Sequence, residues 1–146
     1  MTSMEREQPI RVLFLCTHNS ARSQMAEALL AQIGGERFEV VSAGTEATRV
    51  HPLAIRAMNE VGIDIADARS KHLNEYLGQD FNYVITVCDS ANESCPIFPG
   101  DPQRIHWSFP DPSAVEGSEV DRYRAFERVR NEITMRLRTW VQLPLE

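Results

Sequence analysis

The chain has 146 residues, of which 42% are hydrophobic and 25% charged, as is ordinary for one globular domain. Its formal net charge is -6 and its lysines and arginines form no long run, which argues against a nucleic-acid-binding protein. The sequence has neither a signal-peptide pattern nor the roughly 20 apolar residues of a membrane helix, so we expect a cytoplasmic protein without membrane contact.

The polar N-terminus predicts a flexible extension over residues 1–8, followed by a single catalytic domain over 9–146 that we expect to be a monomer. Three cysteines in a reducing compartment favour transient, chemical disulfides over structural ones. Because the sequence has neither Cys-x-x-Cys nor paired histidines, we predict no metal site and no bound cofactor.

The first predicted element is a buried strand over residues 11–15, which runs into a polar loop and then into a helix from Arg22 to Gly34. Such a unit points backbone N–H groups and the positive end of a helix at one spot, which suits a tetrahedral oxyanion. The residues expected to bind the anion are Thr17, His18, Asn19, Ser20, Ala21, Arg22 and Ser23.

Cys16 opens this loop and is the expected nucleophile. The amides and the Arg22 guanidinium favour its thiolate form, and the Ser23 hydroxyl can donate to the sulfur. His18 either contacts the anion or faces solvent, and Asn19 is expected to shape the loop through side-chain to backbone hydrogen bonds.

The remaining elements alternate, which predicts an α/β fold: a doubly wound, three-layer sheet of four parallel strands with helices on both faces. Further strands are expected at 38–42, 81–87 and 104–107, and helices at 52–62, near 72–78, and from a Ser118–Asp121 capping box to about 141. In such sheets the ligand lies at the carboxyl ends of the strands. Cys16, Cys88 and Asp111 all follow strand ends, so we place them on one rim.

The loop from Cys16 to Ser23 resembles the phosphate-binding loop of the low-molecular-weight protein tyrosine phosphatases and of the related thiol-dependent, thioredoxin-coupled arsenate reductases. The resemblance covers nearly the whole chain. It continues in Ser42–Gly44, Val87–Cys88, Cys95–Pro96, and His106–Trp107 through Asp111–Pro112. It implies an arsenate reductase for which phosphate and sulfate are competing oxyanions and thioredoxin is the external reductant.

In this interpretation Asp111 protonates the departing oxygen, Cys88 attacks the sulfur of Cys16, and Cys95 then attacks Cys88. Residues 89–94 are expected to be partly helical when reduced and to loop out when Cys88 and Cys95 bond. His106 is expected to be structural.

Two alternatives remain at this stage. A tyrosine phosphatase would need Cys16, Arg22 and Asp111 but neither of the other cysteines, and Ser113 stands where those enzymes usually carry a tyrosine. A non-catalytic oxyanion-binding module would need only the loop and Arg22.

Some related reductases hold a potassium ion beside the loop, with residues that match Asn19, Glu27 and Ser42 here. The threonine and aspartate that complete that site are replaced by Arg69 and Lys71. A lysine ammonium repels a monovalent cation, so we predict no potassium dependence.

Overall fold

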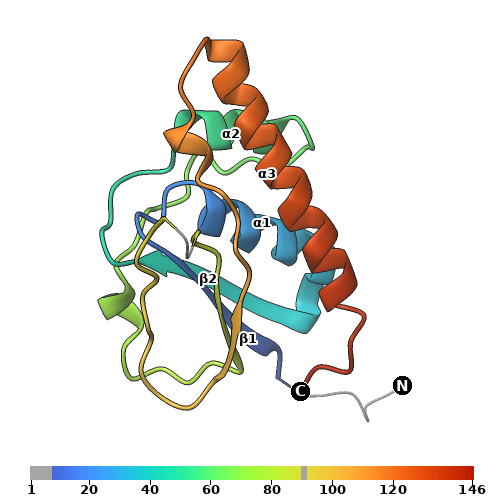
Figure 1. Ribbon diagram of the computed structural model, residues 1–146. Helices are drawn as coiled ribbons and strands as arrows, with labels where there is room; N and C mark the ends of the chain where they lie inside the picture. Colours follow the sequence, from blue (N-terminus) through green and yellow to red (C-terminus); the bar gives the residue numbers. More distant parts are fainter. Residues whose placement is uncertain (1–7, 90–91) are drawn as a thin grey trace.

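A computed structural model describes residues 8–89 and 92–146, so residues 1–7 of the expected extension lie outside the described residues. Four parallel strands form one sheet in the order β2-β1-β3-β4 (Figure 1). The strands are β1 (Ile10–Cys16), β2 (Phe38–Gly44), β3 (Tyr83–Thr86) and β4 (Gln103–His106). The predicted α/β class and the four-stranded parallel sheet are confirmed.

Helices cover the two faces of the sheet unequally. On one face lie α1 (Arg22–Gly34), α2 (Pro52–Asn59) and α3 (Glu119–Trp140), whereas the short 3-10 helix η3 (Leu73–Tyr76) lies on the other (Figure 1). Two further 3-10 turns are η2 (Gly35–Arg37) and η4 (Pro112–Ala114). Within the described residues, no helix combines the length and apolar character of a membrane span.

The central position of β1 explains its apolar sequence from Val12 to Cys16. Val12 and Phe14 point into the core beneath the three α-helices, whereas Leu13 and Leu15 pack on the opposite face with residues such as Phe98. A parallel strand that is buried on both faces has no solvent side on which a polar residue would be favourable. The strand at the start of the anion loop is therefore held from both sides.

Helix α3 begins at the predicted capping box, in which Ser118 Oγ accepts from the Asp121 amide at 3.1 Å and the Asp121 carboxylate accepts from the Ser118 amide. The apolar residues of this helix, from Val120 to Trp140, are expected from their spacing to form one buried stripe. Tyr123, Phe126 and the later positions are buried, but Val120 is 58% exposed. Val120 lies in the first turn, before the helix reaches the core, so its inclusion in the stripe was wrong.

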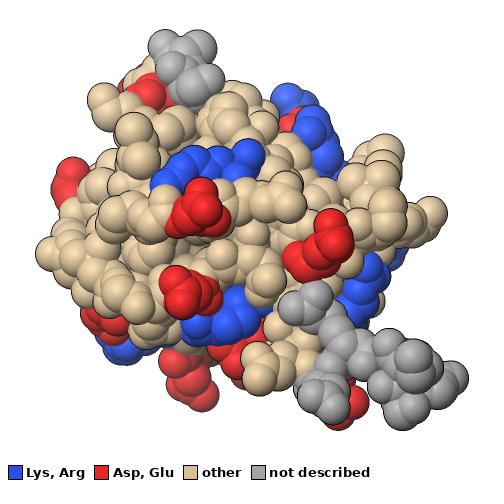
Figure 2. Space-filling model, turned by 90° about the horizontal axis from the view of Figure 1, so that it is seen from below, with Lys and Arg blue, Asp and Glu red and all other residues tan. Residues whose placement is uncertain are grey.

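On the molecular face drawn in Figure 2, acidic and basic side chains are interspersed over a largely uncharged surface. No continuous basic patch appears on that face.

A polar cluster joins α2 to α3. The Glu60 carboxylate accepts a hydrogen bond from the Tyr123 hydroxyl at 2.6 Å and another from Arg130 Nη1 at 3.1 Å. These two bonds lower the pKa of Glu60 to about 2, and burial together with Glu60 raises the pKa of Tyr123 to about 12. Ionised Glu60 therefore stabilises the folded protein.

We predict that Glu60→Gln lowers the free energy of unfolding at pH 7. Because the folded-state pKa lies below the ordinary value, the contribution of Glu60 is complete above about pH 4.5 and is lost as the pH falls through about 2. Urea unfolding at a series of pH values should therefore show a wild-type advantage that shrinks below pH 4.5. Glu132→Gln, on the exposed side of α3, is the control. A constant difference across that range would contradict the assignment.

Candidate functional site

Strand pairing brings the reactive residues to one end of the sheet. Leu15 of β1 pairs with Thr86 of β3, and the Val87 amide donates to the Leu15 carbonyl at 2.9 Å. Cys16 follows Leu15 directly, and Cys88 follows Thr86 after one residue, Val87. The prediction that both cysteines lie on the same rim is therefore confirmed.

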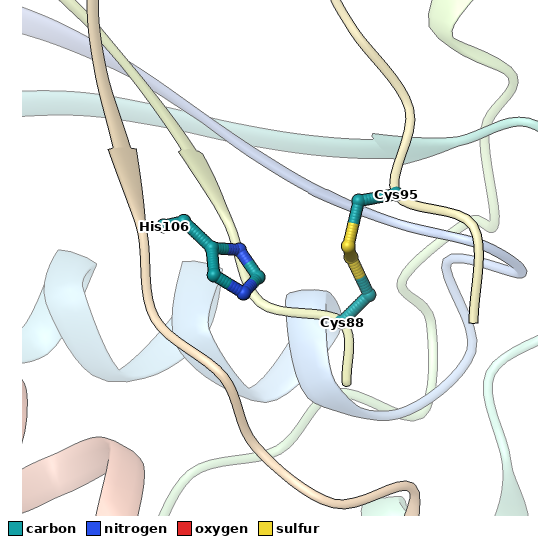
Figure 3. A group of neighbouring side chains, drawn as sticks. All are labelled: Cys88, Cys95 and His106. Atoms are coloured by element: carbon teal, nitrogen blue, oxygen red, sulfur yellow. A yellow bond between two sulfur atoms is a disulfide. The ribbon is translucent and has the colours of Figure 1, made fainter. Parts of the chain in front are cut away.

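Cys88 and Cys95 form a disulfide, with 6.0 Å between their Cα atoms (Figure 3). Cys88 is fully buried and Cys95 is half-buried. Of the segment expected to change shape, residues 90 and 91 lie outside the described residues, while the Asp89 carbonyl accepts from the Glu93 amide at 2.8 Å. The expected helix of the reduced form stays a prediction.

The loop after β1 is packed closely against the end of β2. A Cβ atom at Gly44 would lie 2.5 Å from the Thr17 carbonyl oxygen and 2.8 Å from that of Cys16. Real Cβ atoms essentially never approach backbone so closely, so only glycine fits at this position. The Ser42–Gly44 stretch is thus a support for the loop.

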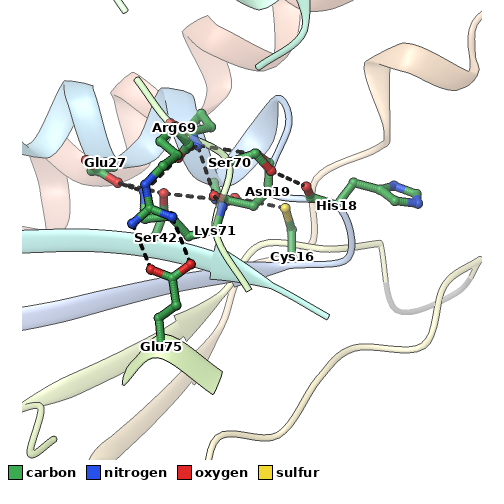
Figure 4. Close-up of polar contacts among 11 residues, drawn as sticks. Cys16, His18, Asn19, Glu27, Ser42, Arg69, Ser70, Lys71 and Glu75 are labelled. Atoms are coloured by element: carbon green, nitrogen blue, oxygen red, sulfur yellow. Dashed lines mark hydrogen bonds and ion pairs between the residues drawn. The ribbon is translucent and has the colours of Figure 1, made fainter. Parts of the chain in front are cut away.

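Asn19 holds the loop in shape (Figure 4). It has a φ of 50°, in the left-handed region that asparagine tolerates better than most residues, and its side chain is buried. Its Nδ2 donates to Ser23 Oγ at 2.8 Å and to Ser42 Oγ at 2.9 Å, while its Oδ1 accepts from the Lys71 amide at 2.7 Å and from Gln24 Nε2 at 2.9 Å. One of these bonds, from the Lys71 amide, is of the predicted side-chain to backbone kind, but it joins the loop to a segment 52 positions away, and the others join side chains.

Cys16 is buried at the base of the loop, and its Sγ lies 2.9 Å from Ser23 Oγ. Because Ser23 already accepts a hydrogen bond from Asn19, its own hydroxyl proton is available to the sulfur. The predicted contact between Ser23 and Cys16 is confirmed. A hydroxyl donor in this position stabilises a thiolate.

Arg22 is buried at the start of α1 and is held by two partners. Nη1 donates to the Phe109 carbonyl at 3.1 Å, and Nη2 donates to Glu93 Oε1 at 2.5 Å and lies 3.9 Å from Asp111 Oδ2. Burial lowers the pKa of Arg22, but the Glu93 hydrogen bond and the negative charges of Cys16 and Asp111 outweigh it and leave the pKa raised. The guanidinium is therefore a permanent cation.

A cleft of about 610 Å³ opens over the loop, and its walls include Thr17, Glu93, Cys95 and Asp111. Among the residues that the structure describes, Thr17 Oγ1 is a buried oxygen without a hydrogen-bond partner. Asp111 Oδ1 accepts from the Ser113 amide and hydroxyl, which leaves Oδ2 on the side of Arg22. Two carboxylates of the cleft wall, Glu93 and Asp111, thus lie beside the buried Arg22 guanidinium.

Backbone hydrogen bonds from other loop residues hold the loop in place. The Ser20 carbonyl accepts from the His51 amide at 3.0 Å, and the Ala21 carbonyl accepts from the Met25 amide at 2.9 Å. The His18 side chain is half exposed, points away from Cys16 (Figure 4), and lies 3.8 Å from Glu46. Of the two interpretations of His18, the structure favours the solvent-facing one.

Lys71 lies beside Asn19, Glu27 and Ser42, the three residues that the resemblance matched to a potassium site (Figure 4). Its buried ammonium donates to the Arg69 carbonyl at 3.0 Å and lies 3.6 Å from Glu27 Oε1, which also accepts from Ser42 Oγ at 2.6 Å. The Arg69 side chain turns outward to Glu75. These residues do not fit a bound monovalent cation, because a positive charge already faces the carboxylate.

Sequence reasoning missed Glu93 as a partner of Arg22. The two residues are 71 positions apart, and Glu93 belongs to a polar segment without hydrophobic periodicity. A buried arginine needs a carboxylate partner, and this requirement could be inferred from the sequence. The sequence did not indicate which acidic residue would be that partner.

The sequence matches the low molecular weight phosphotyrosine protein phosphatase family over residues 11–144. It is 42% identical over 131 residues to an arsenate reductase of Halalkalibacterium halodurans, covering 90% of this chain and 94% of that protein. A crystal structure of arsenate reductase from Archaeoglobus fulgidus has a TM-score of 0.76 at 31% identity, over 90% of this chain and 99% of that one. A thioredoxin-dependent arsenate reductase of Corynebacterium glutamicum has a TM-score of 0.70 at 31% identity, over 95% of this chain and 63% of that one.

We predict that Glu93→Gln strengthens binding of inorganic phosphate to the oxidised protein. The Glu93 carboxylate accepts from the guanidinium that an oxyanion would engage, and a charged hydrogen bond contributes about 1.5–3 kcal/mol. Calorimetric titration of the disulfide form at fixed ionic strength should show an affinity gain of about tenfold. Glu46→Gln removes a charge from the same cleft without touching Arg22 and is the matched control. Equal gains in both variants would show only a general charge effect.

We also predict that exchanging sodium for potassium at equal ionic strength leaves the activity and the thermal midpoint of the wild type unchanged. Lys71→Ala removes the ammonium and leaves the Glu27 carboxylate without its cation. The midpoint of this variant, measured by scanning calorimetry, should therefore be higher in potassium than in sodium. A potassium gain in the wild type would overturn the assignment of Lys71.

Proposed function

The chain belongs to the low molecular weight phosphotyrosine protein phosphatase family, and we propose that within this family it reduces arsenate to arsenite through a relay of three cysteines. The observation that carries the proposal is the Cys88–Cys95 disulfide beside the loop of Cys16. A phosphatase needs one thiol, whereas a reductase needs further thiols to supply two electrons. The relatives that are named arsenate reductases support the same conclusion.

Arsenate binds in the loop, where backbone amides and the Arg22 guanidinium meet its negative oxygens. The unpartnered Thr17 hydroxyl supplies a further donor. Phosphate and sulfate have the same tetrahedral shape and similar charge, so they compete for the same donors.

The first chemical step is attack of the Cys16 thiolate on arsenic. A sulfur–arsenic bond forms and an arsenic–oxygen bond breaks, and Asp111 gives its proton to the departing oxygen, which leaves as water. The Ser23 hydroxyl, 2.9 Å from the sulfur, holds the thiolate before the attack. Arg22 keeps the anion oriented throughout.

The second step carries out the reduction. The Cys88 thiolate attacks the sulfur of Cys16, and the sulfur–arsenic bond breaks with its electron pair left on arsenic, which departs as arsenite. Cys95 then attacks Cys88, which releases Cys16 as a thiolate and produces the disulfide seen here. Arsenic has gained two electrons, and the two thiols of Cys88 and Cys95 have lost them.

The external reductant is a dithiol protein of the thioredoxin class. Cys95 is half-buried and lies beside an apolar hollow of about 320 Å³ whose walls include Pro96, Ile97 and Phe98. Ile97 is 82% exposed, which gives a partner protein an apolar contact directly next to the disulfide. The dependence on thioredoxin in the name of the Corynebacterium relative supports this assignment.

Phosphatase activity is the second candidate, favoured by the family match and by the shared loop. Water would then release phosphate from a Cys16 phosphocysteine without any use of Cys88 or Cys95. Ser113, which follows Asp111–Pro112, donates its hydroxyl to Asp111 at 2.7 Å and offers no aromatic ring to pack on a tyrosine substrate. We therefore expect at most slow hydrolysis of small aryl phosphates.

Single cysteine variants distinguish arsenate reduction from phosphatase activity. Arsenate-dependent NADPH oxidation with thioredoxin and its reductase should be lost in Cys16→Ser, Cys88→Ser and Cys95→Ser, because each variant breaks the relay at one thiol. Hydrolysis of p-nitrophenyl phosphate should be lost only in Cys16→Ser. Full arsenate turnover in Cys88→Ser or Cys95→Ser would exclude the relay.

A further inference from the structure

Beside the disulfide lies a third side chain that the relay does not use. His106 ends β4, the strand paired with β3, and its register partner is Thr86. One ring nitrogen of His106 and the sulfurs of Cys88 and Cys95 all lie within 4.8 Å of one another. In Figure 3 the nitrogen-bearing edge of the ring is turned towards the disulfide.

We propose that after reduction of the disulfide Cys88, Cys95 and His106 form a binding site for a zinc-like divalent cation. Two thiolates and an imidazole are a preferred donor set of zinc, at about 2.3 Å for sulfur and 2.0–2.1 Å for nitrogen. Tetrahedral geometry with these bond lengths requires ligand atoms about 3.6–3.8 Å apart. In the disulfide form these atoms lie within 4.8 Å of one another, so a cation bound between the separated sulfurs would hold residues 89–94 in the looped-out form, against the helix expected of the metal-free dithiol.

The orientation of the imidazole suits this role. His106 Nδ1 lies 2.6 Å from Thr86 Oγ1, and the Thr86 hydroxyl donates a longer bond, 3.5 Å, to the Ile105 carbonyl. When the Thr86 hydroxyl donates to the Ile105 carbonyl, Thr86 accepts from Nδ1–H, and that tautomer leaves the lone pair on Nε2. Histidines that ligate metals commonly have their second nitrogen fixed by such a partner.

The site is open to solvent on one side. Cys88 is buried, Cys95 is half-buried and His106 is exposed, so a cation can enter past the imidazole and keep water as its fourth ligand. Binding releases the two thiol protons and involves no electron transfer. The thiols themselves arise from reduction of the disulfide by the same dithiol that serves the relay.

The cation would hold both thiols that the relay needs. On the basis of the proposed function, the metal-bound enzyme is therefore inactive, and its thiols are protected from oxidation until the metal is removed. The site exists only in the dithiol state, because disulfide sulfurs are not thiolate ligands. Zinc thus competes directly with disulfide formation.

The test uses Cys16→Ser as the parent protein, so that neither turnover nor the Cys16 thiol contributes. Titration of the reduced parent with Co²⁺ should give one equivalent bound, with intense sulfur-to-cobalt absorption in the near ultraviolet and visible bands of a tetrahedral site. Zn²⁺ should displace the cobalt. Added His106→Ala should weaken binding more than tenfold, and added Thr86→Val about tenfold, as expected for a residue that orients a ligand.

His18→Gln, which removes the histidine beside the anion cleft, is the control and should bind cobalt like the parent. Absence of a one-to-one charge-transfer band in the reduced parent would overturn the proposal. Equal zinc affinity of parent and His106→Ala would overturn it as well, and Thr86→Val keeps the test valid if His106→Ala does not fold. Because these titrations contain no arsenate, they are independent of whether the relay operates.

A second experiment measures the effect of zinc on arsenate turnover by the wild type, in which the relay is intact. Zinc should inhibit arsenate turnover reversibly, a chelator should restore it, and His106→Ala should require at least tenfold more zinc for the same inhibition. Equal inhibition of both proteins would show that zinc acts elsewhere and would overturn the assignment of this site to the relay thiols.

Discussion

The parallel pairing of β3 with its two neighbours is the constraint on which the functional site depends. Pairing with β1 brings the position after Leu15 beside the positions after Thr86, and pairing with β4 sets Thr86 opposite His106. A slip of one residue in either ladder would turn each side chain to the opposite face of the sheet. The meeting of Cys16, Cys88 and His106 at one rim is thus a property of strand register and not of any local motif.

Each buried positive charge at the site is paired with a nearby carboxylate. The chain as a whole is negative, yet two buried cations lie at the loop and each faces a carboxylate: Arg22 at its end, and Lys71, whose amide donates to Asn19. Burial of a charge without a partner is costly, so Glu93 and Glu27 are what make these cations tolerable in the folded protein. The pairs differ in their surroundings: Glu93 lines the cleft over the loop, whereas Glu27 also accepts from Ser42 Oγ.

Local patterns in the sequence predicted most of the fold. The apolar run of β1, the helix beginning at Arg22 and the Ser118–Asp121 cap depend on neighbours within a few positions, and the structure has all three. Contacts between distant segments could not be predicted in this way. Glu93 on Arg22 joins residues 71 positions apart. His106 was expected to be structural, and the spacing of cysteines and histidines predicted no metal site, because the cluster joins the end of β4 to two positions in the segment that follows β3.

The close packing of Gly44 against the loop has a thermodynamic consequence. With the end of β2 pressed against the carbonyl groups of Cys16 and Thr17, the curvature of the loop is set when the sheet forms, before any ligand arrives. These peptide groups lose their conformational entropy when the protein folds, so binding an anion does not have to order them again in each catalytic cycle. A small, strongly hydrated anion can therefore exchange its water shell for a cradle that is already rigid.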